Sequence, residues 1–210
     1  MWYKYFDKIF LINLADRFDR LYDSALLLNE YEIPFERFEA VKHNDGYFGL
    51  VLTMKKLFKE CLDKDINNIL VFEDDISFCE CKDYMDVVMN DCVEWMMKNN
   101  WGQFYLGVQH GKAFGNLIAP HVLRVEAGYS THAVAYSKHC MEHFMHNYVQ
   151  EPIDNFFVRE YQPFGKSFCS YPLLATQRTN YSNIYNEQMD WNRYIRKSYE
   201  DATRNLKENL

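Results

Sequence analysis

No two cysteines in this sequence have the CxxC spacing that is typical of paired metal-binding or redox thiols. The six cysteines are scattered along the chain, at Cys61, Cys79, Cys81, Cys92, Cys140 and Cys169. This distribution indicates neither a zinc knuckle nor a disulfide framework. We expect all six thiols to be reduced.

Long hydrophobic runs are also missing. No stretch approaches the roughly 18 apolar residues of a membrane-spanning helix. The first residues lack the apolar core and the small-residue cleavage site of a signal peptide. We therefore expect no integral membrane segment and a cytoplasmic location.

Blocks of lysine and arginine are absent as well, as are internal repeats and low-complexity tracts. The formal net charge is −7 at pH 7, which disfavours nonspecific binding of nucleic acid. The sequence thus predicts no nucleic-acid partner. An anionic ligand would need basic side chains gathered locally around it.

The composition that remains fits one globular domain. With 210 residues, of which 48% are hydrophobic and 25% charged, the chain can bury a substantial core. We assign this domain to residues 1–184. Residues 185–210 are polar and helical in character, which predicts a C-terminal helix packed on the domain or trailing from it.

Short apolar runs alternate with helical patterns in the first half of the chain. A nearly continuous apolar run such as residues 8–14 is typical of a strand buried on both faces of a parallel sheet. The alternation predicts an α/β fold with a doubly wound sheet, whose ligands bind beyond the carboxyl ends of the strands. The expected strands are 8–14, 35–41, 67–72, 103–107, 122–125 and 131–137, and the expected helices are 19–30, 50–62, 85–97, 138–149 and 155–160.

Three consecutive acids, Glu73, Asp74 and Asp75, end the apolar run of residues 68–72. Adjacent carboxylates at the end of a buried strand repel one another and lose hydration. A divalent cation would remove this conflict, and hard oxygen ligands suit Mg²⁺ or Mn²⁺. The alternative is a solvated turn that carries a helix cap, although a cap needs only one Asp.

Several motifs together resemble glycosyltransferase family 25, which includes lipooligosaccharide and procollagen galactosyltransferases. The resemblance spans roughly residues 8–185. It implies a GT-A fold, in which a Rossmann-like central sheet, mixed but mostly parallel, is flanked by helices in a single domain. The motifs are residues 12–14 with Arg17 and Arg20, residues 38–41, residues 71–76, residues 129–136, residues 152–156, and residues 172–177 followed by 182–184.

The resemblance implies a nucleotide-sugar site and a metal site. Asp75 is the first candidate for the metal ligand, and Glu73 is the second, unless Glu73 holds ribose hydroxyls or a metal-bound water. Asp74 would face the sugar or orient its neighbours. The residues implied at the nucleotide sugar are Ile12, Asn13, Leu14, Arg17, Arg20, Ala40, Glu73, Asp74 and His132.

Three of these assignments have simpler alternatives. Arg17 or Arg20 could neutralise the phosphates, or both could merely decorate the first turns of a helix. His132 could reach the site, or it could be a hydrogen-bonded structural residue in a strand.

Asp154 is the candidate general base, because the resemblance implies a carboxylate near the acceptor in the segment that begins with Pro152. An inverting transfer needs such a group to take the proton of the attacking hydroxyl. The alternative is that Asp154 caps the helix that follows Pro152.

The sequence departs from the family pattern in two places. The C-terminal Ser-Asp-Ile motif reads Ser182-Asn183-Ile184, which weakens any role for an acid there. The Gly-x-x-x-Ser-His motif appears as Gly49 with Thr53 and Met54, and it therefore lacks the His. Donor or acceptor preference could differ accordingly from that of the galactosyltransferases.

A rival motif lies further along the chain. His139, Glu142 and His143 match H-x-x-E-H, the inverted zinc-peptidase pattern. Such a site also needs a third zinc ligand from another segment.

The sequence therefore predicts a metal-dependent glycosyltransferase that uses Mn²⁺ or Mg²⁺. It would move a hexose-type sugar from a nucleotide-sugar donor, a UDP-sugar, to a hydroxyl of a glycan or glycoprotein acceptor, with inversion. The two alternatives are a noncatalytic nucleotide-sugar or carbohydrate-binding module and the zinc peptidase.

Overall fold

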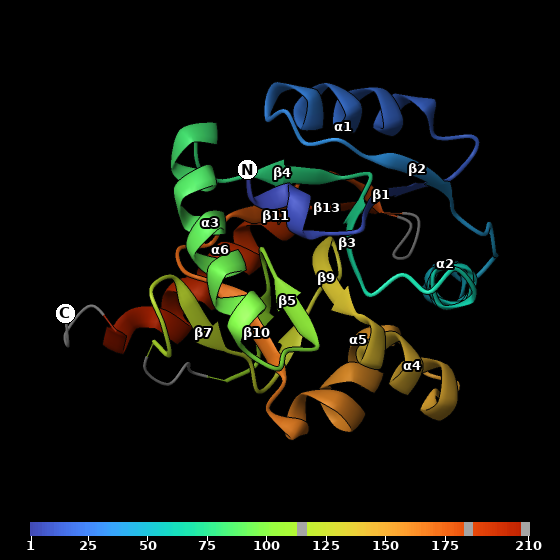
Figure 1. The fold of residues 1–210 in the computed structure, drawn as a ribbon. Coiled ribbons are helices and arrows are strands. Elements are labelled where there is room, and N and C mark those ends of the chain that lie inside the picture. The colour runs from blue at the N-terminus through green and yellow to red at the C-terminus, as the bar shows by residue number, and fades with distance from the viewer. Residues whose placement is uncertain (113–116, 183–186, 207–210) are drawn as a thin grey trace.

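A central sheet of seven strands forms the middle layer of the protein (Figure 1). The structure is a computed structural model that describes residues 1–112, 117–182 and 187–206. The strands, in spatial order, are β2 (Glu36–Glu39), β1 (Lys8–Asn13), β3 (Asn68–Glu73), β9 (Ala133–Ser137), β5 (Gln103–Tyr105), β10 (Ser167–Ser170) and β7 (Val122–Arg124).

The sheet is mixed but mostly parallel. β1 pairs in parallel with both β2 and β3, and β5 pairs in parallel with β10. β9 lies antiparallel between β3 and β5, and β7 is antiparallel to β10. Five strands of this sheet thus run in one direction, and β9 and β7 run in the other.

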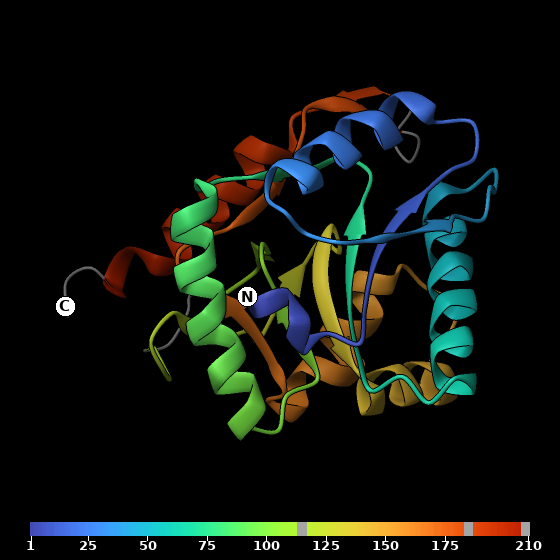
Figure 2. The same cartoon turned by 45° about the horizontal axis from the view of Figure 1, so that its top comes forward.

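Helices cover both faces of the sheet. Figure 2 shows α3 (Lys82–Lys98) along one side and α2 (Gly46–Asp63) along the other. α1 (Phe18–Glu30) shares the apolar layer of α3, and α4 (Lys138–Asn147) shares that of α2. The expected α/β class, with a mostly parallel central sheet flanked by helices, is confirmed.

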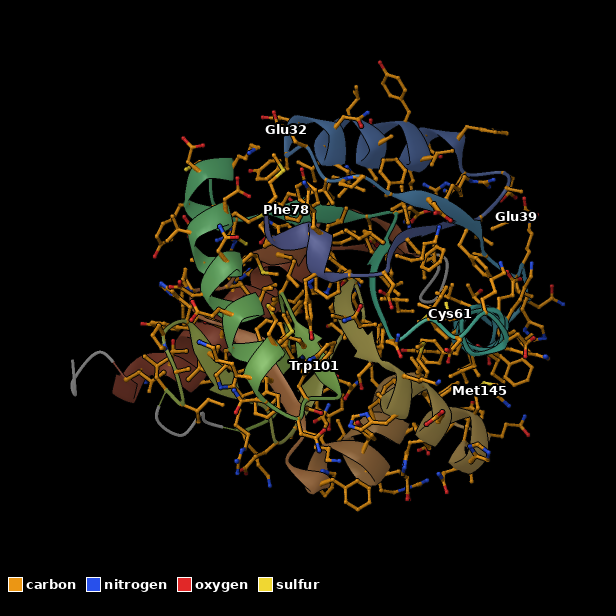
Figure 3. The ribbon with its side chains drawn as sticks, in the orientation of Figure 1. Glu32, Glu39, Cys61, Phe78, Trp101 and Met145 are labelled. Atoms are coloured by element: carbon orange, nitrogen blue, oxygen red, sulfur yellow. The ribbon has the colours of Figure 1, made fainter. Side chains whose placement is uncertain are left out.

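The middle of β3, residues 69–72, is apolar at every position. Ile69 and Val71 pack into the layer of α2 and α4, whereas Leu70 and Phe72 pack into the layer of α1 and α3. Successive strand residues point to opposite faces, so a strand covered on both faces needs apolar residues at every position. In Figure 3 the side chains of Glu32 and Glu39, by contrast, lie at the periphery.

Capping residues set the starts of several helices. Asp45 begins α2 by accepting a hydrogen bond from the Phe48 amide at 3.2 Å, and Ser137 begins α4 in the same way through the Cys140 amide at 3.4 Å. These bonds satisfy amides that have no partner within the helix.

The expected helix after Pro152 is α5 (Ile153–Phe156), which continues as a helical segment through Phe157–Tyr161 and Gln162–Phe164.

Short two-stranded sheets surround the central one. β4 (Ile76–Phe78) pairs with β11 (Ala175–Gln177), and this pair joins the acidic segment to the C-terminal part of the chain. The other pairs are β6 (Gln109–His110) with β8 (Gly128–Tyr129), and β12 (Asn180–Ser182) with β13 (Glu187–Met189).

The C-terminal helix α6 (Trp191–Thr203) packs on the rest of the chain. Ile195 and Tyr199 bury against Leu173, and the Tyr199 hydroxyl donates a hydrogen bond to the Ser170 carbonyl at 3.0 Å. The boundary that we assigned at residue 184 lies outside the described residues. No described helix has the length and apolar content needed to span a membrane.

Candidate functional site

One cleft collects most of the residues that the sequence singles out. It has a volume of about 700 Å³ and lies at the carboxyl ends of β1 and β3. This is the edge of an α/β sheet at which ligands bind. The cleft is lined by Ile12, Asn13, Leu14, Arg17, Arg20, Ala40, Glu73, Asp74, Asp75 and Asp154, among others.

The three acids occupy the turn between β3 and β4, and each has different surroundings. Glu73 ends β3, and its amide donates to the His132 carbonyl at 2.9 Å, next to the pairing of β3 with β9. Asp74 and Asp75 follow in the turn before β4. The pairing of β3 within the sheet therefore places the acids at the cleft. Contacts with other segments determine the direction of each carboxylate.

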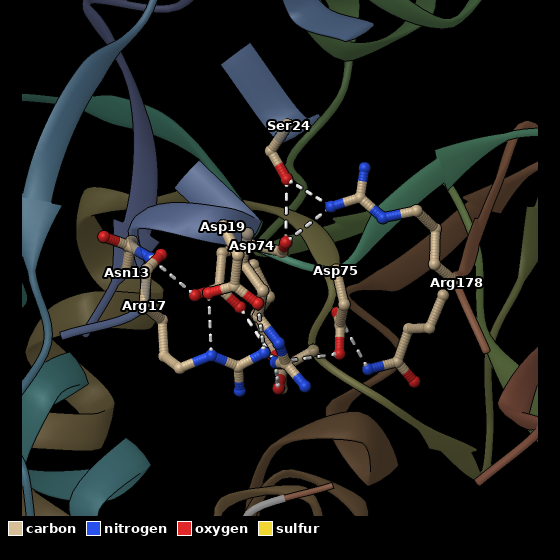
Figure 4. A network of polar contacts seen from close by, with 11 residues as sticks. Asn13, Arg17, Asp19, Ser24, Asp74, Asp75 and Arg178 are labelled. Carbon is tan, nitrogen blue, oxygen red and sulfur yellow. Dashed lines mark hydrogen bonds and ion pairs between the residues drawn. The ribbon is translucent and has the colours of Figure 1, made fainter. Parts of the chain in front are cut away.

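Asn13 and Arg20 hold the Asp74 carboxylate. Its Oδ2 accepts a hydrogen bond from Asn13 Nδ2 at 2.7 Å, and its Oδ1 accepts one from Arg20 Nη1 at 3.0 Å (Figure 4). Asp74 is 8% exposed, and burial, followed by the charge of Asp75, raises its pKa. Both oxygens thus have protein partners, and the role of orienting its neighbours, one of the two expected for Asp74, stays a prediction.

The two arginines at the start of α1, Arg17 just before it and Arg20 within it, have different partners. Arg17 forms a two-bond pair with Asp19, at 3.0 and 2.8 Å. Arg20 instead approaches the acids, with Nη1 at 3.0 Å from Asp74 and 3.6 Å from Asp75. For Arg20, a merely decorative place on the helix is therefore wrong.

Glu73 and Asp75 have different partners in the cleft. Glu73 Oε1 accepts a hydrogen bond from Thr131 Oγ1 at 2.6 Å, and Asp75 Oδ1 accepts one from Gln177 Nε2 at 3.3 Å. Asp75 Oδ2 lies 3.6 Å from Arg20 Nη1, within ion-pair distance. Burial, followed by the charge of Asp75, raises the pKa of Glu73 to about 8. Burial also raises the pKa of Asp75, which Arg20 opposes.

This donor set fits a divalent cation that the protein holds only in part. Two hard carboxylate oxygens suit Mn²⁺ or Mg²⁺, and a cation would relieve the cost of enclosing two acids together. The described residues contain no group of three His, Cys, Asp or Glu side chains that could hold a metal ion. The remaining ligands would have to come from a bound substrate and water.

Asp154 faces the same cleft from α5. Burial raises its pKa to about 6, and a hydrogen bond from the Ser130 amide opposes this rise. Ser130 has a φ of 80°, a left-handed conformation that is uncommon outside glycine. The helix-cap alternative for Asp154 is wrong, because the capping position of α5 is Pro152. A carboxylate with this pKa is largely ionised at pH 7 and can accept a proton.

His132 lies beneath the cleft rather than in its lining. Its side chain is fully buried, and Nε2 lies 3.2 Å from the Ala175 carbonyl oxygen. Burial lowers its pKa to about 4, so the imidazole is neutral at pH 7. These contacts favour the structural alternative for His132.

The two histidines of the zinc-peptidase motif contact other side chains of the protein. His139 Nδ1 lies 2.6 Å from Ser137 Oγ, and the ring of His143 packs against Tyr161 and Phe164. A catalytic zinc site needs three protein ligands, and no such group exists among the described residues. The third zinc ligand that the peptidase alternative needs is thus not found among the described residues.

The two departures from the family pattern have different outcomes. Thr53 Oγ1 accepts a hydrogen bond from the Val41 amide at 2.8 Å and donates one to the Gly49 carbonyl at 2.8 Å. This contact holds the segment before α2 beside the cleft. Met54, which stands where the family pattern has His, is buried in the apolar layer of α2. Asn183 and Ile184 lie outside the described residues.

The sequence did not predict several of the contacts in the cleft. Thr131 and Gln177 lie within the quoted motifs, but nothing in the sequence pairs them with Glu73 and Asp75. Arg178, which reaches the acidic turn from the end of β11, gave no signal at all. Tyr129 and Trp191 also line the cleft.

No known protein-family model and no curated protein matches the sequence. Among solved structures, the chain is similar to A197 from STIV, with 11% identity and a TM-score of 0.47 over 87% of this chain and 93% of that one. It is also similar to a glycosyltransferase involved in the glycosylation of the major capsid of PBCV-1, with 13% identity and a TM-score of 0.48 over 85% and 95% of the two chains. A third similar structure is mannose-1-phosphate geranyltransferase from Thermus thermophilus, with 10% identity and a TM-score of 0.41 over 79% and 59%. These similarities concern the fold alone.

Proposed function

We propose that this chain is a metal-dependent glycosyltransferase that moves a hexose-type sugar from a UDP-sugar to a hydroxyl of a glycan or glycoprotein acceptor, with inversion. One observation carries the proposal. Glu73 and Asp75 line the same cleft that Asp154 lines from another segment of the chain. Such a cleft can hold a donor diphosphate and an activated acceptor together. The resemblance to glycosyltransferase family 25 supports the assignment of roles.

In this proposal the acceptor oxygen forms a bond to the anomeric carbon of the donor sugar. The bond from that carbon to the diphosphate oxygen breaks, and its electron pair leaves with the diphosphate. The acceptor proton passes to Asp154, whose pKa of about 6 leaves it ionised at neutral pH. A cation held by Glu73 and Asp75 would stabilise the charge on the leaving diphosphate.

The positive charge near the diphosphate would come from α1. Arg20 lies 11% exposed at the acids, where it offsets part of the cluster's negative charge. An anion that enters this cleft therefore meets a guanidinium as well as carboxylates. Asn13, through Asp74, would keep Arg20 in this place.

Calorimetric titration of UDP with and without Mn²⁺ tests the donor part of the proposal. We expect Mn²⁺ to tighten UDP binding at least about tenfold, since the protein supplies only two of the metal's ligands and the phosphates complete the set. Asp75→Asn should abolish this gain, whereas Asp63→Asn, an exposed acid at the end of α2, should leave it unchanged. Equal UDP affinity with and without metal would overturn the proposal.

Release of UDP from a UDP-hexose, measured with and without saccharide acceptors, tests the catalytic part. We expect turnover in the wild type that Asp154→Asn lowers by at least about 100-fold. Metal-coupled binding of UDP with no turnover for any UDP-hexose would instead identify a noncatalytic nucleotide-sugar-binding module.

A further inference from the structure

Arg178 holds the acidic turn from the side of α1. It follows β11 directly, and its guanidinium lies beside Ser24 of α1 (Figure 4). Arg178 Nη2 donates hydrogen bonds to the Asp74 carbonyl oxygen at 2.8 Å and to Ser24 Oγ at 2.9 Å. Ser24 Oγ, in turn, donates to the same Asp74 carbonyl at 2.7 Å. One carbonyl thus receives bonds from two segments that are distant in the sequence.

The backbone of Arg178 holds the next carbonyl. Its amide donates a hydrogen bond to the Asp75 carbonyl oxygen at 2.6 Å. The Asp74 carbonyl belongs to the peptide that enters Asp75, and the Asp75 carbonyl belongs to the peptide that leaves it. Since peptide units are planar, contacts to these two oxygens restrict both planes beside the Asp75 Cα. They therefore restrict the direction in which the Asp75 side chain leaves the backbone.

The positive charge of Arg178 strengthens its side-chain hydrogen bonds to the Asp74 carbonyl and to Ser24, and neither acceptor is a carboxylate. Its two acceptors are a neutral carbonyl and a neutral hydroxyl, and hydrogen bonds from a charged donor are stronger than those from a neutral one. Among the described residues, no carboxylate lies within ion-pair distance of Arg178. Replacement of Arg178 therefore breaks no ion pair, and it removes a charge that lowers the pKa of Asp75.

We propose that Arg178 is a positioning residue that fixes the Asp74–Asp75 and Asp75–Ile76 peptides, and thereby the direction of the Asp75 carboxylate toward the cleft. Arg178 lines the same cleft, and in this inference it acts on the cation through Asp75. The functional part of this inference rests on the proposed function, in which Asp75 holds the cation beside the donor diphosphate. The structural part concerns the free protein alone.

Hydrogen exchange of the unliganded protein tests the structural part. In Arg178→Met the peptide that covers residues 73–78 should exchange about tenfold faster than in the wild type, because the loss of charge-assisted hydrogen bonds eases local opening. Ser24→Ala, which keeps the bond from Arg178 to the Asp74 carbonyl, should change this exchange less than about threefold. Peptides of α3 should exchange as in the wild type in both variants. Wild-type exchange of residues 73–78 in Arg178→Met would overturn the inference.

The Mn²⁺ requirement of UDP binding tests the link to function. Arg178→Met should raise the half-saturating Mn²⁺ concentration about tenfold while the affinity for uridine stays within about twofold of the wild type. In Arg178→Ala, millimolar guanidinium should restore part of the Mn²⁺ affinity. A change in uridine affinity of the same size, or an unchanged Mn²⁺ requirement, would overturn the positioning role. If the wild type itself lacks metal-coupled UDP binding, the proposed function fails, and the exchange experiment still decides the structural part.

Discussion

Asn13, the last residue of β1, donates a hydrogen bond to the carboxylate of Asp74, which lies 61 positions later, just beyond the end of β3. The bond is 2.7 Å long and buried. It joins the ends of two parallel neighbouring strands, which the sheet brings to the same edge. Because Arg20 holds the other Asp74 oxygen, this carboxylate connects β1, α1 and the acidic turn.

Asp74→Ala should lower the free energy of unfolding by about 3 kcal/mol, because it leaves the enclosed Arg20 guanidinium and the Asn13 amide short of a partner. Asp19→Ala is a matched control, since Asp19 also pairs with an α1-region arginine but its side chain is 64% exposed. An exposed pair of this kind contributes less than about 1 kcal/mol. Urea unfolding of the three proteins measures the difference. Equal losses in the two variants would contradict the connecting role of Asp74.

Asp154→Asn should stabilise the protein at pH 8 while it removes activity. Burial raises the pKa of Asp154 from 3.8 to about 6, so the folded state holds this proton more tightly than the unfolded state does. The resulting contribution to stability is fully present below about pH 3.8 and is lost as the pH rises through about 6. The free energy of unfolding falls by about 3 kcal/mol as a result, and this fall does not occur in Asp154→Asn. Urea unfolding at pH 4 and pH 8 should show the two proteins converging at pH 4 and the variant more stable at pH 8.

The same pKa predicts the acid limb of the activity profile. A general base must be ionised, so kcat/KM for transfer should fall about tenfold for each pH unit below about 6 and should level off above it. The profile is measured with the UDP-sugar far below saturation and with Mn²⁺ in excess. A rate that stays constant from pH 4.5 to 7 would exclude Asp154 as the base.

Gly107→Ala should destabilise the core beneath the cleft. A Cβ at this position would lie 1.8 Å from the Ala175 carbonyl oxygen and 2.7 Å from His132 Nε2. Backbone must move to relieve such overlap, at a cost of about 3 kcal/mol in the free energy of unfolding. Gly111→Ala is the control, since its Cβ would meet first a ring carbon of Tyr129 at 3.1 Å. Thermal unfolding should rank the wild type and Gly111→Ala close together and Gly107→Ala well below them.

The sequence predicts an element well when the residue types of that element depend directly on its own burial. β3 is apolar at every position from Ile69 to Phe72 because both its faces are covered, and this pattern needs no knowledge of its partners. The position of the acids follows in the same way, since they end the run. The placement of β9 between β3 and β5 cannot be predicted from the sequence. The residues of β3 and β5 do not indicate which strand pairs with them or in which direction.

The roles within the acidic turn show where such prediction stops. Asp74 and Asp75 are identical side chains in adjacent positions, and sequence offers no ground for sending one to Asn13 and the other to Gln177. His132 likewise sits in a motif expected at the site, yet its imidazole is buried against Ala175. These outcomes depend on partners that are distant in the chain.

The sequence by itself determined that a buried strand delivers three acids to the ligand-binding edge of an α/β sheet, and that an aspartate follows Pro152 in the second half. Periodicity and residue type carry this information locally. The tertiary structure alone decided that Asp74 pairs with Asn13 and Asp75 with Gln177, with Arg20 beside both, and that burial raises the pKa of Asp154 to about 6. The physical reason is that hydrogen-bond partners and loss of hydration act through space, between segments that only the folded chain brings together.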